Sequence, residues 1–426
     1  MINCDVLIVG TGISGLFTAL NLNSRLNIVV LSKSTIRECN SYLAQGGISV
    51  ARNVDDIPSF IEDTLNAGNH KNSVDSVSLL AKQSLDVIDD LISLGVNFDR
   101  DKSHYSYTKE GGHKINRILH CKDETGKAVM EVLISQINKR DNITILENTT
   151  LVDIYKSSHS LGGIAKQNGQ DLFINSKTVV LATGGIGGLF KSSTNFETLT
   201  GDGLSICYNN DVELKDMEYL QLHPTVLFEN SNKTRRLLLS ESLRGEGGIL
   251  RNLNREIFVD SLLPRDKVSA AILSEIKNHP DNPYVYLDLT HLSKEYLTTR
   301  FPFLYSECLK HGFNMEKDLI PVCPGHHYTM GGVKVDEDSR TSLPHLYAVG
   351  EVSCTGVHGS NRLASNSLLE GLVFSKNCAI DINKNIENLD NSNVVFNRNN
   401  TILENKDFIN YIKRKADSRY DRLFNC

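Results

Sequence analysis

A glycine-rich turn near the N-terminus constrains the fold more than any other feature of the sequence. The segment GTGISG at residues 10–15 fits the pattern G-x-G-x-x-G. It stands between apolar residues 4–9, which predict a buried strand, and residues 14–22, whose apolar spacing predicts a helix. Residues 27–32 then predict a second buried strand. Such a β-α-β unit requires a parallel sheet covered by helices, and its turn offers backbone N–H groups to the pyrophosphate of a dinucleotide.

The same pattern of strands and helices continues further along the chain. Helical periodicity covers residues 73–94 and 125–139, and the second of these helices is followed by an apolar strand, NITIL. Buried strands are predicted at residues 178–182 and 346–351, and a further helix at 365–382. We therefore expect several parallel strands in one sheet.

The middle of the chain is richer in charge and less regular. We expect an α/β protein with a Rossmann-like dinucleotide-binding domain formed by residues 1–216 and 326–385, into which an α+β capping domain at 217–325 is inserted. Two domains suit the 426 residues, since a single core rarely grows past about 250–300 residues. Residues 386–426 are Asn-rich and predict a short tail or a helix around 406–418.

Charge and cysteine usage exclude several classes of protein. The net charge of −6 argues against nucleic acid as the main partner. No apolar run reaches the roughly 18–20 residues of a membrane span, and no secretory signal pattern is visible. The nine cysteines form no C-x-x-C pair, so we expect no metal site or iron–sulfur cluster. Free thiols without an export signal indicate a cytoplasmic protein.

Four features beyond the turn bear on the kind of nucleotide. Lys33 ends the second strand, where an NAD-binding protein usually carries an acid, so a simple NAD site is disfavoured; the lysine either contacts an adenosine or lies in solvent. The small-residue loop at 42–47 is suited to lying against a flat ring. Glycines at 184–185 and the pair Gly350-Glu351 each end a buried strand. Each segment alone is compatible with an ordinary turn, but together they favour a flavin nucleotide.

Ten segments then occur in a recognisable order. They are GTGISG, SYLAQGG, TKEGGHKINRILH, ATGG, GDG, QLHPT, SESLRGEGG, PRDKV, HHYTMGG and AVGEVSCTGVHGSNRLASNSLLEG. Over residues 3–385 the chain thereby resembles the succinate dehydrogenase/fumarate reductase flavoprotein family, and within it the aspartate-oxidising members. The resemblance implies FAD-dependent oxidation of L-aspartate to iminoaspartate, the first step of quinolinate and NAD synthesis. It implies oxygen, fumarate or a quinone as the electron acceptor, and quinolinate synthase as a candidate receiver of iminoaspartate.

The resemblance also implies which residues hold the cofactor. They are Gly10, Thr11, Gly12, Ile13, Ser14, Gly15, Lys33, Asn40, Ser41, Tyr42, Leu43, Ala44, Gln45, Gly46, Gly47, Asp202, Glu351, Ser367 and Leu368. In the respiratory members a histidine in the loop before A-Q-G-G bonds covalently to the flavin. The corresponding residue here is Asn40, which cannot form that bond, so non-covalent FAD is expected.

A dicarboxylate substrate needs charge-assisted donors at both ends, and the planar fork of arginine suits a carboxylate. The resemblance implies four substrate ligands: His223, Ser240, His327 and Arg362. A lone histidine or arginine usually makes a structural hydrogen bond instead, but these stand in Gly-, Pro- or Ser-rich turns, which favours function. His326 precedes His327, and the choice of His327 depends on its distance from Tyr328 and the following glycines.

The resemblance assigns the proton transfer to Arg265. An arginine side chain is a poor base, with an ordinary pKa above about 12, so it needs an electrostatic context and a proton path. Glu241 and Arg244 resemble a relay toward solvent, although their spacing also fits a helical ion pair. Glu110 resembles the acid that faces the ammonium of the substrate in the aspartate-oxidising members.

Two other functions remain open. A soluble fumarate reductase would share the fold and most of the site, although Glu110 and Asn40 argue against it. A dicarboxylate sensor or assembly subunit would not need the Glu241–Arg244 pair. The aspartate-oxidising members usually carry a longer C-terminal helical domain, so oligomer contacts and partner docking are not predicted here.

The residue at position 40 gives a direct test of the cofactor linkage. The purified protein should be yellow, and precipitation with acid should release the colour into the supernatant, because an asparagine amide forms no bond to a flavin. Absorbance of the supernatant and the pellet measures the outcome. Colour retained in the pellet would contradict the assignment of Asn40.

Overall fold

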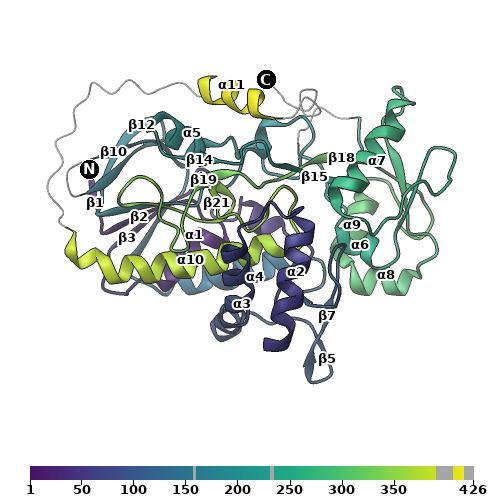
Figure 1. Cartoon of the computed structure of the whole chain (residues 1–426), viewed down its shortest axis with the longest axis horizontal. Coiled ribbons are helices and arrows are strands. Elements are labelled where there is room, and N and C mark those ends of the chain that lie inside the picture. Colours follow the sequence, from purple (N-terminus) through teal and green to yellow (C-terminus); the bar gives the residue numbers. More distant parts are fainter. Residues whose placement is uncertain (157–159, 231–234, 390–405, 417–426) are drawn as a thin grey trace.

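The computed structural model describes residues 1–156, 160–230, 235–389 and 406–416 (Figure 1). At its centre lies a five-stranded parallel sheet with the order β20-β13-β2-β3-β9. Its strands are β2 (Val6–Val9), β3 (Ile28–Leu31), β9 (Ile143–Leu146), β13 (Thr178–Leu181) and β20 (Leu346–Ala348). All but β9 are buried along their whole length, as expected where both faces of a parallel sheet are covered.

Alternate side chains of each strand enter two different cores. In β2, Val6 and Ile8 pack with helices, whereas Leu7 and Val9 point to the opposite face. The helices on the first face are α1 (Ile13–Asn21), α3 (Val74–Leu94), α4 (Thr125–Ile137) and α10 (Asn366–Asn385), with α2 (Ile57–Ala67) packed on α3 (Figure 1). The opposite face is covered by antiparallel strands β10 (Thr149–Lys156), β11 (Leu161–Gln167) and β12 (Gln170–Asn175), joined by β1 (Ile2–Asn3).

Two helices complete this second core. They are α5 (Asp202–Asn209) and α11 (Lys406–Lys415). On α11, Phe408 and Ile412 are fully buried, and a Cβ added at Gly201 would lie 3.0 Å from the Phe408 ring. The C-terminal helix therefore packs directly beneath the turn that begins α5.

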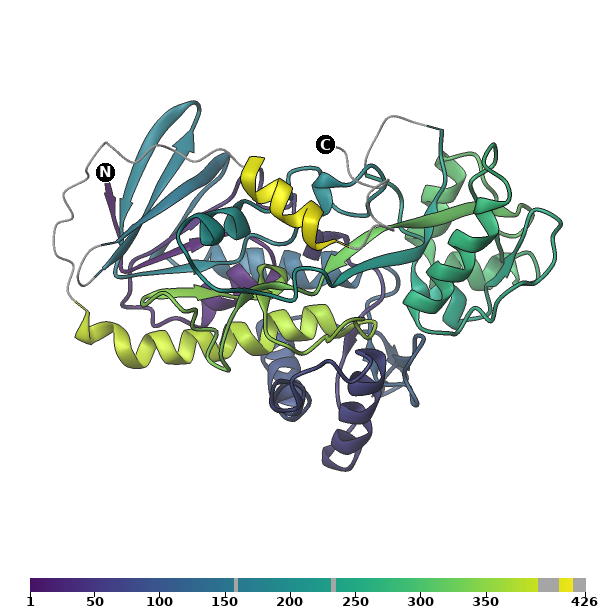
Figure 2. The same ribbon diagram turned by 45° about the horizontal axis from the view of Figure 1, so that its top comes forward.

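The region between residues 217 and 325 has its own apolar core, built around Leu243, Leu287 and Phe301. An antiparallel sheet of order β15-β18-β17-β16 runs through it: β15 (Leu220–Leu227), β16 (Ile249–Arg251), β17 (Val285–Asp288) and β18 (Ile320–Thr329). Its helices are α6 (Glu241–Gly245), α7 (Arg265–Lys277), α8 (Lys294–Arg300) and α9 (Pro302–Lys310). Figure 2 shows this region to one side, connected by the long strands β15 and β18. The predicted boundary after residue 325 falls inside β18, and the division into domains stays a prediction.

Short elements complete the described chain. They are β4 (Ile48–Ser49), β5 (Arg100–Asp101), β6 (His104–Tyr105), β7 (Tyr107–Thr108), β8 (Ile118–Leu119), β14 (Leu214–Lys215), β19 (Gly332–Lys334), β21 (Ser353–Cys354) and the 3-10 helices η1 (Asn40–Leu43), η2 (Val54–Asp56), η3 (Gly187–Leu189), η4 (Gly350–Val352) and η5 (Ile386–Asn388). In the four described ranges, no helix combines the length and the hydropathy that crossing a bilayer requires.

The α/β class is confirmed, and the predicted strands and helices of the parallel sheet are present within a few residues of their expected ends. The helix expected at 73–94 ends where Gly95 adopts φ 113°, a left-handed conformation that favours glycine. The helix expected around 406–418 is present at Lys406–Lys415, and the last two residues of that prediction lie outside the described ranges. The β10–β12 sheet was not predicted.

Gly15 allows the close contact between α1 and the turn before it. A methyl group there would lie 2.0 Å from the Gly10 carbonyl oxygen, so Gly15→Ala should lower the free energy of unfolding of the cofactor-free protein by about 1–3 kcal/mol or more. Urea titration followed by circular dichroism measures this. Gly12→Ala is the control, because a methyl there meets only Ser41 Oγ, at 3.2 Å. Equal losses in both variants would contradict the packing role of Gly15.

Candidate active site

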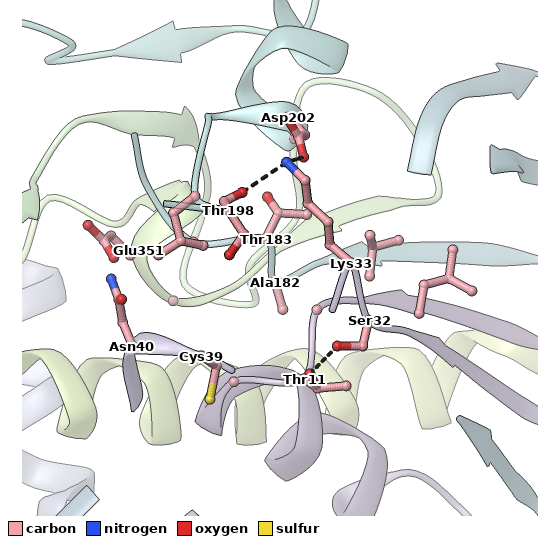
Figure 3. Close-up of a pocket in the computed structure, with 18 of the residues that line it drawn as sticks. Thr11, Ser32, Lys33, Cys39, Asn40, Ala182, Thr183, Thr198, Asp202 and Glu351 are labelled. Carbon is pink, nitrogen blue, oxygen red and sulfur yellow. Dashed lines mark hydrogen bonds and ion pairs between the residues drawn. The ribbon is translucent and has the colours of Figure 1, made fainter. Parts of the chain in front are cut away.

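A cavity of about 130 Å³ opens at the carboxyl ends of β2, β3 and β13 (Figure 3). This is the edge of a parallel sheet at which ligands of such folds bind. The cavity is lined by ten of the residues predicted to hold the cofactor: Gly10, Thr11, Gly12, Ile13, Ser14, Lys33, Asn40, Ser41, Asp202 and Glu351. Gly15 lies behind this wall, where it packs against Gly10.

Lys33 reaches across the cavity to the start of α5. Its Nζ donates to Asp202 Oδ2 at 2.7 Å, to Thr200 Oγ1 at 2.8 Å and to the Thr198 carbonyl at 2.9 Å (Figure 3). An acid is therefore present at the end of β3, but it is contributed by a segment far away in the sequence. Since the ammonium is only partly exposed, Lys33 is a structured part of the wall rather than a freely solvated surface group.

Three features of this cavity suit a pyrophosphate and the groups attached to it. The backbone of Gly10 has φ 116° and runs so close to Ala182 that a Cβ would lie 2.1 Å from its carbonyl oxygen, which leaves the turn without side chains. Within the described residues no side chain caps Gly12 at the start of α1, where helix N–H groups attract anions. Thr183 Oγ1 also lies in the wall without a partner among the described atoms.

Glu351 stands where this cavity meets a second one, and it faces Asn40 (Figure 3). Its Oε1 accepts a hydrogen bond of 3.0 Å from the Thr329 N–H. Burial raises the pKa of Glu351 to about 7, against the smaller lowering effect of that hydrogen bond. A ribose hydroxyl would find a strong acceptor here, because a buried carboxylate gains from each donor.

The second cavity, of about 540 Å³, has the size of an ordinary ligand pocket. It shares Ile13, Ser14, Asn40 and Glu351 with the first. Its wall contains the 40–47 loop and the predicted residues Glu110, His223, Ser240, Glu241, Arg265, His327, Arg362, Ser367 and Leu368. The structure therefore brings together residues that are up to about 250 positions apart in the sequence. Arg244 is absent from the lining.

Arg265 lies at the start of α7, and two side chains hold its guanidinium. Its Nε donates to Glu241 Oε2, and its Nη1 donates to Gln221 Oε1 at 2.9 Å. Glu241 Oε1 lies 3.4 Å from Arg244 Nη2, so the three charges form a buried row. Burial raises the pKa of Glu241, but the charges of Arg265 and Arg244 outweigh it and keep the pKa below its ordinary value. Arg244 has no exposed side-chain surface, so it lies behind the cavity wall rather than at the protein surface.

His223 on β15 and His327 on β18 form part of the same wall, with ring centroids 5.1 Å apart. Burial, and after it the charge of Arg265, holds the pKa of both rings well below the ordinary value, so both are neutral. His223 Nε2 has no partner among the described residues, whereas His327 Nδ1 lies 2.7 Å from Thr194 Oγ1. His326 points to the other side of the strand, where its ring stacks on Phe190 at 4.1 Å.

Arg362 provides a second buried guanidinium. It lies over the Tyr328 ring at 4.6 Å, and its Nη1 donates to Ser367 Oγ at 2.9 Å. Its Nε finds no partner in the part of the chain that the structure describes. Burial lowers the pKa of Arg362 to about 10, and the charge of Arg265 contributes in the same direction. An anion in this cavity would relieve that repulsion, although the chain as a whole is negative.

Glu110 adds a carboxylate to the same cavity. Its Oε1 accepts from Ser242 Oγ at 2.9 Å and its Oε2 from Ser365 Oγ at 2.7 Å. Burial, and after it the charge of Glu241, raises the pKa of Glu110. A cation beside Glu110 would therefore be stabilised as strongly as an anion beside the arginines.

Several contacts of the site were not predicted from the sequence, among them Gln221, Ser242 and Ser365. Gln221 stands two residues before His223 in a strand, so both side chains point to the same face. That alternation was the available signal, and it had not been used because residues 220–227 had not been recognised as a strand.

Comparison with known proteins gives independent information. The family described as FAD binding domain matches residues 5–368. The chain is 52% identical to L-aspartate oxidase of Clostridium perfringens (strain 13 / Type A) over 387 residues, which span 91% of this chain and 88% of the relative. It is 39% identical to L-aspartate oxidase of Neisseria meningitidis serogroup B, over 88% of this chain and 77% of the relative. A solved structure of E. coli quinol fumarate reductase aligns with a TM-score of 0.85 at 29% identity, covering 97% of this chain and 74% of that one.

The raised pKa of Glu351 predicts a pH-dependent stability of the cofactor-free protein. Between the ordinary value of 4.5 and about 7 the folded state keeps a proton that the unfolded chain has lost, so stability should fall as pH rises, by up to about 1.4 kcal/mol per pH unit. Glu351→Gln, which cannot ionise, should lack this contribution. Urea unfolding at several pH values measures it, and parallel pH profiles for the two proteins would show that the prediction is wrong.

Proposed function

This chain belongs to the FAD binding domain family and, within it, to the L-aspartate oxidases, and on that basis we propose that it oxidises L-aspartate to iminoaspartate. FAD is the cofactor, and when bound it takes up the hydride from the substrate Cα. The observation that carries the proposal is the charge pattern of the second cavity. Two buried arginines and a buried carboxylate, Glu110, line one space and match the two carboxylates and the ammonium of aspartate.

The residues of the first cavity would hold the nucleotide part of FAD. The turn at residues 10–14 offers backbone N–H groups to the pyrophosphate, and Glu351 offers a carboxylate to a ribose. The loop at 40–47, with Ser367 and Leu368, lies where the two cavities join and would support the flavin ring beside the substrate. Asn40 keeps the cofactor non-covalent in this proposal.

The substrate ligands would act by orientation. Arg362 and Arg265 each offer a planar pair of donors to a carboxylate, and His223, His327 and Ser240 offer neutral hydrogen-bonding groups beside them. Neutral histidines suit this task, because two more positive rings beside two guanidinium groups would be costly to bury. Binding in one orientation brings the Cα hydrogen toward the cofactor side of the cavity.

The reaction also removes a proton from the substrate nitrogen. We assign this proton to Arg265, whose Nε already donates to the Glu241 carboxylate. Glu241 stays ionised beside two arginines, so it can accept a proton through Arg265 and pass it toward Arg244. Arg244 in turn donates to the Ser261 carbonyl, which keeps its guanidinium directed away from the cavity.

Glu110 distinguishes this function from the reduction of fumarate. Aspartate carries an ammonium that a buried carboxylate attracts, whereas succinate and fumarate carry none. The chain also shares a higher identity with the aspartate oxidases than with the fumarate reductase structure, 52% against 29%.

The electron acceptor, the fate of the product and the compartment belong to the same proposal. Oxygen, fumarate and a quinone are candidate acceptors, and quinolinate synthase is the candidate receiver of iminoaspartate at the start of NAD synthesis. Eight cysteines in the described ranges are free thiols, which supports a cytoplasmic enzyme.

The test is anaerobic bleaching of the visible flavin band by L-aspartate and by succinate, added separately to the purified holoenzyme. We expect aspartate to bleach the band, because Glu110 complements its ammonium, and succinate to do so far less. Bleaching by succinate alone would favour a fumarate reductase, and bleaching by neither would favour a binding protein without turnover.

Arg265→Lys separates catalysis from binding. A lysine keeps the positive charge but loses the fork that contacts both Glu241 and Gln221, so bleaching by aspartate should slow by a factor of about 100 or more. Retention of FAD and a succinate-induced shift of the flavin spectrum show that the variant still binds both. Bleaching at the wild-type rate would show that Arg265 has no part in the proton transfer.

A further inference from the structure

The carboxylate of Glu110 is held by a residue with an unusual backbone. Ser365 donates to Glu110 Oε2 at 2.7 Å, and its φ is 64°, in the left-handed region. A residue with a Cβ pays an energetic cost for this conformation and keeps it only where the surroundings hold it. The contact with Glu110 therefore depends on whatever fixes the backbone of Ser365.

Hydrogen bonds fix the peptide units on both sides of Ser365. Its own carbonyl accepts from the Ser49 N–H and from Ser49 Oγ, each at 3.1 Å. The preceding carbonyl, that of Ala364, accepts from His113 Nε2 at 3.0 Å. A carbonyl oxygen can only accept, so His113 carries its proton on Nε2.

The second ring nitrogen of His113 agrees with this tautomer. Nδ1 lies 3.3 Å from Arg117 Nη1, and an arginine can only donate. Arg117 is completely buried and is itself held by Asp63 and by Asp56, whose Oδ1 accepts at 2.9 Å. Burial lowers the pKa of His113 to about 4, and the charge of Arg117 adds to this, so the ring is neutral near pH 7.

We propose that His113 is a positioning residue for the choice of substrate. A buried chain from Asp63 through Arg117 and His113 holds the Ala364–Ser365 peptide so that the Ser365 hydroxyl meets Glu110. His113 is not part of the cavity lining, so it acts through the orientation of Glu110 and not by contact with the substrate. The inference rests on the proposed function, because Glu110 selects between substrates only if one of them carries an ammonium.

Two substitutions separate the contacts of His113. His113→Asn retains an oxygen that can accept from Arg117 but is too short to reach Ala364, whereas His113→Gln can place an N–H near the position of Nε2. We expect His113→Asn to raise the L-aspartate concentration that half-saturates anaerobic bleaching by about tenfold, and His113→Gln by less than about threefold. The dissociation constant of succinate, read from its shift of the oxidised flavin spectrum, should change by less than about twofold in both.

His120→Asn is the matched control. His120 lies in the same loop, is buried and has its Nδ1 3.1 Å from Asp99, but it makes no contact with Ser365. Its substitution reports on general loosening of the loop and should leave the ratio of the aspartate and succinate constants unchanged.

Ser365→Ala provides a second route to the same answer. It should reproduce the selective loss of aspartate affinity, and adding His113→Asn to it should cause no further loss, because both changes break one chain. Equal losses for aspartate and succinate, additive losses in the double variant, or wild-type behaviour of His113→Asn would overturn the inference. Failure of the wild-type flavin to bleach with aspartate would instead overturn the proposed function.

Discussion

The site depends on like charges that are buried close together before any substrate is present. Arg265 and Arg362 both face the second cavity, and each makes it harder for the other to carry its charge, as the lowered pKa of Arg362 shows. Glu241 compensates for this on the side of Arg265 and binds Arg244 behind it. A cavity of this kind favours a ligand with two negative groups over water, because the ligand completes an ion arrangement whose desolvation cost folding has already met. The carboxylate of Glu110 then adds a demand for one positive group on the same ligand.

The fold explains why these groups meet. The parallel sheet brings the glycine turn, Lys33 and the start of α5 to one edge, and the long strands β15 and β18 extend from that edge into the region with its own core. His223 and His327 stand on this strand pair, so both belong to a rigid ladder rather than to a loop. A substrate in the second cavity would thus contact the cofactor side and the capping side of the protein at the same time.

Much of this could be predicted from the sequence because its signals are local. The glycine turn, the apolar strands and the periodic helices identified the parallel sheet, and short motifs identified most residues of the cavity wall. The β10–β12 sheet escaped prediction because the stretch around Gly162 and Gly163 lacks a regular alternation of apolar and polar residues. The partners of Glu110 escaped for another reason: Ser242 and Ser365 are ordinary serines in sequence, and only the tertiary fold brings them 2.9 and 2.7 Å from one carboxylate. The left-handed backbone of Ser365 carries no signal at all, since serine is not a residue that favours it.

The order of the strands has a consequence for how the protein is made. The edge strand β20 and the helix α10, which covers one face of the sheet, are translated after the whole of the region with the third core. That region has an antiparallel sheet and an apolar core of its own, so it can become compact on the ribosome while the sheet that binds the nucleotide still lacks a strand and a cover. Phe408 on α11, beneath the turn at Gly201, is translated later still. The cofactor can therefore be captured only near the end of synthesis, which makes the supply of FAD to a nearly finished chain part of the folding of this enzyme.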